Sequence, residues 1–166
     1  MDGSTAAVIG ALLGGGAAVA GQAIASRNAR KQAEATERAV LGRERLRQAR
    51  TVYEAFIAQV AMYRHACWIY RDWPAGDGER WLELSRQWAP LITAFTVTEL
   101  EGPKPVSEAA MELQKYAGEL DAAILKYHRG EDNGDEFTTF YESDKYNHLR
   151  ASYALACRDA LAKLAS

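Results

Sequence analysis

Residues 51–70 read TVYEAFIAQVAMYRHACWIY, and this stretch decides the fold class. Large apolar or aromatic side chains recur in it at alternating spacings of three and four residues. They are Tyr53, Phe56, Val60, Tyr63, Cys67 and Tyr70. This heptad spacing places them on one face of an α-helix, and Ile57 widens the apolar stripe. The stretch therefore predicts a long helix that buries one face against other helices.

The same register continues upstream through smaller residues, which are Ala49, Leu46, Gly42 and Ala39. Residues 26–50 hold eight basic side chains against three acidic ones, a net charge of +5, and they are rich in Arg, Glu, Gln and Ala. A helix with so polar a surface is solvated or lies against lipid headgroups. We expect residues 27–50 to form a basic helical stalk that is continuous with the first bundle helix.

Residues 1–26 form an apolar segment rich in Gly and Ala, with no charged side chain from Gly3 to Ser26. About 20 helical residues cover the roughly 30 Å of a bilayer's hydrocarbon core. No basic residue precedes the run, which argues against a cleaved signal peptide. Because Arg27, Arg30 and Lys31 follow it, the positive-inside rule places the C-terminal side in the cytoplasm. The segment predicts a single-pass anchor in the cell membrane, with the N-terminus outside.

Two further features of this segment concern membrane contacts. Gly10 and Gly14 have the small-xxx-small spacing that allows two membrane helices to approach closely, which makes them candidates for helix association. Arg27, Arg30 and Lys31 are candidates for contact with anionic lipid at the membrane surface.

Residues 51–166 carry twelve basic and eighteen acidic side chains, a net charge of −6. This negative charge disfavours nucleic acid as a partner.

Three more helices are predicted after the first. Pro, Gly and Asp in residues 73–78 indicate a turn, and a second helix follows with a kink or short break at Pro90. The loop at residues 101–105 ends it, and Ser107 suits the start of a third helix that ends at residues 128–130. A fourth helix carries apolar residues from Phe137 to Leu161. No segment alternates as a strand, so residues 51–166 predict an antiparallel four-helix bundle and an all-α chain.

The turn between the second and third helices carries a resemblance to a group of known sequences. Residues 100–106 read LEGPKPV and residues 108–110 read EAA, and an apolar helix and an Arg-rich helix precede them. This arrangement resembles a loose group of small, uncharacterised actinobacterial helical proteins, in which a Leu-x-Gly-Pro-x-x-Val turn joins two helices. The resemblance implies a bacterial, helical protein and supplies no functional residues.

Combinations of residues that carry catalysis or bind metals are missing from the sequence. His65 and Cys67 are two residues apart, so on a helix they point about 200° apart and do not grip one ion. Asp144 and His148 suit a surface pair, because the Glu-x-x-His pairs of di-iron bundles are absent. Cys67 and Cys157 lie on or beside apolar faces, where cysteine behaves as a small hydrophobe. The sequence thus predicts a protein that is not an enzyme and binds no cofactor and no metal.

Tryptophans concentrate around the first predicted turn, at Trp68, Trp73, Trp81 and Trp88. One interpretation is a partner-binding patch, because Trp, Tyr and Arg dominate the energetics of protein interfaces. The other interpretation, which we favour, is that these rings fill the core at the end of the bundle.

The functional hypothesis is a non-enzymatic, single-pass membrane protein that presents a cytoplasmic helical bundle as a scaffold or adaptor. Its partners would be the lipid bilayer and either an unknown protein or a second copy of the chain. Two alternatives stay open. One is a soluble helical bundle with a flexible leader, and the other is a membrane-active effector that oligomerises through its Gly-rich helix.

Overall fold

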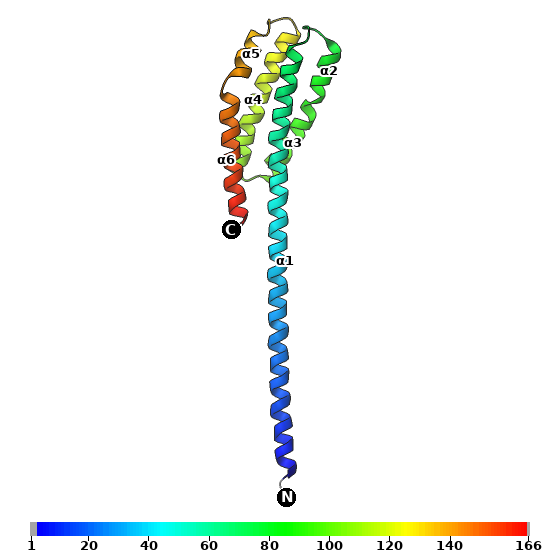
Figure 1. The fold of residues 1–166 in the computed structure, drawn as a ribbon, viewed down its shortest axis with the longest axis vertical. Coiled ribbons are helices and arrows are strands. Elements are labelled where there is room, and N and C mark those ends of the chain that lie inside the picture. Colours follow the sequence, from blue (N-terminus) through cyan, green and yellow to red (C-terminus); the bar gives the residue numbers. More distant parts are fainter. Residues whose placement is uncertain (1–2, 166) are drawn as a thin grey trace. The chain divides into compact units, whose positions relative to one another are not determined.

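The computed structural model describes the backbone of residues 3–165 and the side chains of residues 27–165. Every regular element within the described backbone is a helix (Figure 1). The helices are α1 (Gly3–Arg71), α2 (Gly78–Arg86), α3 (Trp88–Glu101), α4 (Lys104–His128), α5 (Asp135–Glu142) and α6 (Lys145–Ala165). The chain divides into two compact units, Met1–Glu44 and Arg45–Ser166.

The second unit is an all-α bundle of four helical layers, which confirms the predicted fold class for this part of the chain. The layers are α1 from Arg45 onward, the α2–α3 pair, α4, and the α5–α6 pair. Figure 1 shows the α1–α2 and α4–α5 connections at one end of this unit, and the α3–α4 connection at the other end with the C-terminus. Successive layers therefore run antiparallel.

The first unit contains the predicted membrane span. The span at residues 1–26 lies outside the residues whose side chains the structure describes. Among those that it does describe, no helix combines the length and the hydropathy that a bilayer crossing needs. Residues 27–41 of the predicted stalk are helical, and their side chains are all exposed.

The apolar stripe of α1 forms one side of the core, as the heptad spacing predicted. All six heptad residues from Tyr53 to Tyr70 are buried, and Tyr53, at 4% exposure, is the most exposed of them. They pack with buried side chains from each of the other layers, including Leu91, Leu113 and Phe137. Burial of this stripe is the main source of stability for the bundle.

Side-chain size sets how closely the helices approach α4. Ala110 and Ala117 are buried on α4, and the backbones of α3 and α6 approach this helix over the largest number of residues. The buried face of α1 is instead built from large aromatic rings such as Phe56 and Tyr63. Because a ring keeps two backbones farther apart than a methyl group does, α1 packs through its side chains and at a greater distance.

The second predicted helix is interrupted, but not at Pro90. α2 ends at Arg86 and α3 begins at Trp88, so the break lies at Gln87. Pro90 is the third residue of α3, within the first turn, where a backbone N–H has no partner inside the helix. Proline is tolerated there, and the helix restarts just before it.

The α3–α4 connection is shorter than predicted, because α4 begins at Lys104 and not at Ser107. Pro105 fits the first turn of α4 for the same reason as Pro90 fits that of α3. Gly102 donates its N–H to the carbonyl oxygen of Thr98 over 2.9 Å, and a Cβ at Gly102 would lie 2.6 Å from that oxygen. Only glycine fits this turn without a shift, which explains its place in the Leu-x-Gly-Pro sequence.

The fourth predicted helix is also divided, into α5 and α6, with the break at Ser143 and Asp144. Arg64 of α1 reaches the last turn of α5 and donates a hydrogen bond to the carbonyl oxygen of Tyr141 over 2.7 Å. Carbonyl groups at a helix C-terminus lack partners within the helix, and a guanidinium is a good donor for them. Arg64 thus stabilises the end of α5.

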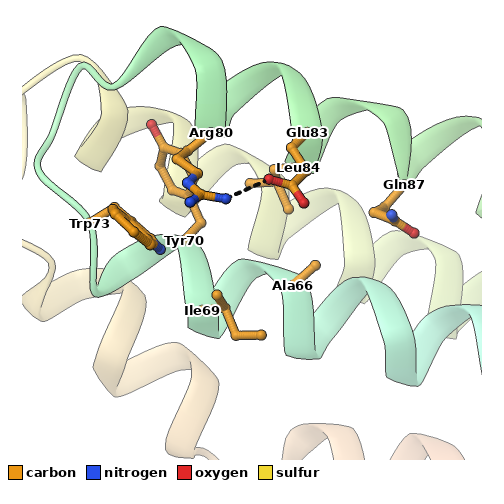
Figure 2. A pocket seen from close by; sticks show the side chains of 8 residues that line it. All are labelled: Ala66, Ile69, Tyr70, Trp73, Arg80, Glu83, Leu84 and Gln87. Atoms are coloured by element: carbon orange, nitrogen blue, oxygen red, sulfur yellow. Dashed lines mark hydrogen bonds and ion pairs between the residues drawn. The ribbon is translucent and has the colours of Figure 1, made fainter.

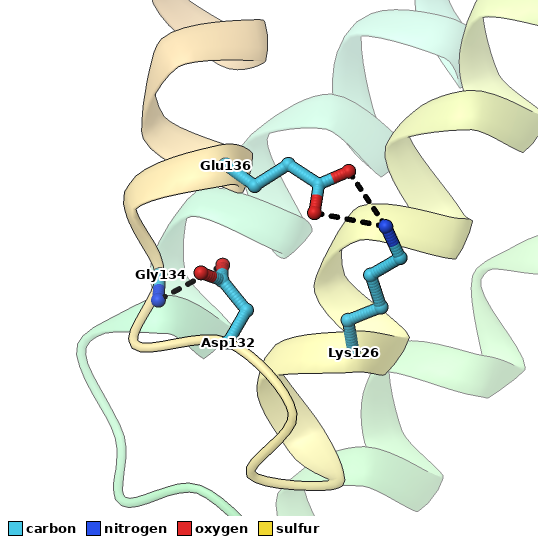
Figure 3. Close-up of polar contacts among 4 residues, drawn as sticks. All are labelled: Lys126, Asp132, Gly134 and Glu136. Atoms are coloured by element: carbon cyan, nitrogen blue, oxygen red, sulfur yellow. Dashed lines mark hydrogen bonds and ion pairs between the residues drawn. The ribbon is translucent and has the colours of Figure 1, made fainter.

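The α4–α5 connection is held by polar contacts (Figure 3). The Asp132 side chain accepts a hydrogen bond from the N–H of Gly134 over 3.0 Å. Gly134 has φ +94°, a left-handed conformation that favours glycine, directly before α5. Lys126 of α4 forms an ion pair with Glu136 of α5 at 2.7 Å. These contacts fix α5 against α4 at the end of the bundle.

Candidate docking surfaces at the two ends of the bundle

Three of the four tryptophans pack against the bundle interior. Trp68 stacks on Tyr141 with ring centroids 4.5 Å apart, and Trp88 meets Tyr63 edge-on at 5.0 Å. Trp81 lies parallel to the His128 ring at 4.6 Å. All three tryptophans are half-buried against the core. Their positions agree with the interpretation that these rings fill the core.

Trp73 is the exception, because its side chain is exposed, at 38%. The guanidinium of Arg80 lies over the Trp73 ring, 4.1 Å from its centroid. Arg80 also forms an ion pair with Glu83 at 2.9 Å. Trp73 and Arg80 lie beside a hollow of about 130 Å³ between α1 and α2. Figure 2 shows Arg80 on the α2 side of this hollow and Ile69 on the α1 side. An exposed Trp with an Arg beside it is typical of the residues that anchor protein interfaces.

The loop that carries Trp73 is held by hydrogen bonds at several points. The Tyr127 hydroxyl donates to the carbonyl oxygen of Trp73 over 2.7 Å, and the backbone N–H of Trp73 donates to the carbonyl oxygen of Tyr70 over 3.0 Å. Asp77 caps α2 by accepting a hydrogen bond from the N–H of Arg80 over 3.0 Å. An anchor whose backbone is already fixed loses little conformational entropy when a partner binds.

The aromatic packing at this end of the bundle includes a polar contact between α1 and α4. The Tyr70 hydroxyl is hydrogen-bonded to Nδ1 of His128, whose ring is stacked on Trp81. Burial raises the pKa of Tyr70 above its ordinary value of 10.0. The phenol is therefore neutral at physiological pH, and it ties the end of α1 to the end of α4.

An apolar groove lies at the opposite end of the bundle, between α1 and α6. Its volume is about 470 Å³. The residues that line it are Leu46, Arg50, Tyr53, Glu54, Ile57, Tyr153, Ala154, Cys157, Arg158, Leu161 and Ala165. We call this the α1–α6 groove.

The spacing of α1 and α6 explains why the groove is open. Tyr153 is buried between the two helices, where its hydroxyl donates to the carbonyl oxygen of Tyr53 over 3.2 Å and its ring meets Phe56. Toward the C-terminus, α6 presents the smaller side chains of Ala154 and Cys157. These side chains are too small to fill the gap that the Tyr153 ring holds open between α1 and α6.

The two cysteines are buried and poorly suited to nucleophilic chemistry. Burial is the main cause that raises the pKa of the Cys67 and Cys157 thiols above their ordinary value of 9.0. Nucleophilic attack needs the thiolate, which a raised pKa makes scarce. Among residues 27–165, no three His, Cys, Asp or Glu side chains come together in a group that could hold a metal ion.

The membrane-surface candidates Arg27, Arg30 and Lys31 are exposed on helical backbone. Gly10 and Gly14 lie outside the residues whose side chains are described, so helix association through them stays a prediction.

Sequence reasoning did not single out the residues of the α1–α6 groove. Ile57 was recognised as widening the apolar stripe and Leu161 as apolar, but both were expected to be covered by neighbouring helices. A comparison with protein-family models, curated proteins and solved structures found no match to this chain. The resemblance to small actinobacterial proteins accordingly stays a prediction.

Proposed function

We propose that this protein is a non-enzymatic adaptor, tethered to the cell membrane by residues 1–26, which presents its bundle in the cytoplasm to a protein partner. The docking surface in this proposal is formed by the exposed side chains of Ile69 and Trp73 and the half-buried Arg80, and we call it the Trp73 surface. The observation that carries the proposal is the exposure of Trp73 on a fixed loop, with Arg80 over its ring and a hollow beside it.

The chemistry of this surface favours a protein over a small molecule. A hollow of about 130 Å³ is smaller than the roughly 300–1,000 Å³ of most small-molecule sites. It is large enough to receive one side chain of a partner, while Trp73 and Ile69 supply apolar contact area around it. Arg80 and Glu83 add charged groups at the edge, where they select a partner by charge.

The membrane tether rests on the sequence alone. The uncharged run from Gly3 to Ser26 is long enough to span a bilayer, and the basic residues that follow it favour a cytoplasmic bundle. The exposed side chains of Arg27, Arg30 and Lys31 would then lie next to anionic lipid.

The test of docking uses a photoreactive amino acid at Ile69 in the full chain, expressed in a bacterial host that carries the native protein. We expect a discrete cross-linked product of higher mass that disappears when Trp73→Ala is added. The matched control has the photoreactive residue at Leu155, which is also exposed but lies on α6. Equal products from both positions, or a product that survives Trp73→Ala, would contradict docking at this surface.

The test of the tether is carbonate extraction of membranes from the same cells. We expect the chain to stay in the membrane pellet, and a variant lacking residues 3–26 to move to the soluble fraction. Complete release of the full chain by carbonate would contradict the tether.

A further inference from the structure

We infer that the α1–α6 groove is a binding site for a long-chain fatty acid carboxylate, with its hydrocarbon chain along the groove and its carboxylate at Arg158. This inference concerns a different end of the bundle from the Trp73 surface, and it stands or falls independently of it.

The volume and lining of the groove suit a small apolar ligand. A volume of about 470 Å³ lies within the range of roughly 300–1,000 Å³ that is typical of ligand sites. The side chains along it are mostly apolar, from Leu46 and Ile57 on α1 to Cys157 and Leu161 on α6. Few groups in this lining can hydrogen-bond a ligand, which favours a hydrocarbon chain over a polar molecule.

The shape of the groove favours a single chain over a partner helix. The lining on α1 runs from Leu46 to Ile57, which is about 16 Å of helix. An α-helix is about 10–12 Å across with its side chains, whereas an extended hydrocarbon chain is much narrower. A single chain can therefore contact the lining residues of both helices along this length.

The charges around the groove favour an anionic head group. Two arginines and one glutamate line it, which leaves one positive charge in excess. Arg50 is ion-paired with Glu54 at 2.7 Å. Arg158 makes only two long hydrogen bonds, both of 3.5 Å, to one carboxylate oxygen of its neighbour Asp159. A guanidinium binds a carboxylate through two parallel hydrogen bonds. Arg158 is therefore the side chain that we assign to the head group.

The probe in the test is tetradecanoate that carries a photoactivatable diazirine, added to the full chain in nanodiscs of phosphatidylcholine. Peptide mapping after illumination is expected to find labelling concentrated in residues 46–57 and 153–165, with labelling of the other helices as the reference. Unmodified tetradecanoate should compete with the probe, and tetradecanol, which has no charge, should compete about threefold to tenfold less well, as expected for the loss of one charge-assisted contact.

Matched variants locate the site. Ala154→Trp places a bulky ring in the groove and should abolish the concentrated labelling. Leu155→Trp, at the next position, which is also exposed but does not line the groove, should leave it unchanged. Ala165→Trp, at the exposed end of α6, repeats the block if Ala154→Trp fails to fold. Arg158→Gln should weaken competition by tetradecanoate but not by tetradecanol, and Arg150→Gln on the same helix should change neither.

Three results would overturn the inference. The first is labelling spread evenly over the helices or unchanged by both groove-filling variants, which indicates partition of the probe into lipid. The second is equal competition by tetradecanoate and tetradecanol, which removes the anionic head group. The third is a cross-link between two copies of the chain from a photoreactive residue at Ala154, without fatty acid competition, which would make the groove a self-interface.

Discussion

Both ends of the bundle include α1, yet one end is filled with side chains and the other is open. Near the α1–α2 connection, rings from four helices interlock, with Trp68 on Tyr141 and Trp81 on His128. Near the C-terminus, α6 turns alanines and a cysteine toward α1, and a groove of about 470 Å³ remains. The largest side chains set the spacing of the helices, and smaller side chains farther along the same face leave a groove between them.

Alkaline pH should lower the free energy of unfolding the most, because it ionises buried tyrosine and cysteine side chains along the whole bundle. Burial raises the pKa of Tyr63 and Tyr153 above 10.0 and that of Cys67 above 9.0. The folded state thus holds these protons more tightly than the unfolded state. The stability that they contribute is complete below pH 9 and falls as the pH rises, by more than about 1 kcal/mol per pH unit for each protected group.

We expect unfolding of the whole bundle at alkaline pH, followed by circular dichroism, together with phenolate absorbance that rises in the same transition. Phenolate absorbance from all eight tyrosines well before the loss of helix would show that the buried rings are accessible in the folded state.

Thiol alkylation at a pH where the bundle stays folded should modify Cys157, which lines the groove, before Cys67, which has 0% exposure.

A pair of core truncations tests the difference in packing directly. Phe137→Ala removes a fully buried ring that contacts Trp68 and Tyr141, and it should lower the free energy of unfolding by about 3–5 kcal/mol. Leu161→Ala trims a half-buried side chain that already borders open space, so it should cost only about 1 kcal/mol. Chemical denaturation measures both, and similar losses would refute the contrast between the two ends.

A pair of tryptophan variants distinguishes a ring that packs on the core from an exposed ring at the filled end. Trp81→Ala removes a ring that contacts Tyr70 and His128, and we expect a loss of about 2–3 kcal/mol. Trp73→Ala removes an exposed ring and should cost less than about 0.5 kcal/mol. Thermal denaturation of the two variants gives the comparison, and a large fall in melting temperature for Trp73→Ala would assign this residue to the core.

The α3–α4 turn shows that the open end also has a tightly constrained position. Gly102→Ala puts a Cβ against the Thr98 carbonyl oxygen and should destabilise the bundle by about 1–3 kcal/mol. The matched control is Gly118→Ala within α4, where nothing lies within 4 Å of the added Cβ. That change should stabilise the helix by about 0.5–1 kcal/mol, and both are read from urea midpoints.

Helix boundaries show how far the sequence predicts the fold. The end of α4 at His128 follows from a basic last turn and the glycine two residues later, and these local signals were sufficient. The break at Gln87 and the start at Lys104 were misplaced by about three residues each. The reason is that proline was interpreted as a breaker, whereas in both helices it occupies the first turn, where it causes no loss of hydrogen bonds.

The division of the fourth helix at Ser143 had no clear signal in the sequence. It depends on Arg64, about 80 residues earlier in the chain, whose guanidinium reaches the carbonyl oxygen of Tyr141 and lies over its ring at 3.6 Å. A contact between distant residues has no periodic pattern along the chain, so sequence spacing alone does not reveal it.

By itself, the sequence determined that residues 51–166 form an all-α bundle and which face of each helix is buried, because the period of apolar residues fixes both. It also placed the tryptophans at one end. Only the tertiary structure decided that Trp73 is exposed while Trp68, Trp81 and Trp88 are covered, and that a groove opens between α1 and α6. The physical reason is that periodicity states which side chains face inward, whereas the space between two helices depends on the sizes of side chains from both.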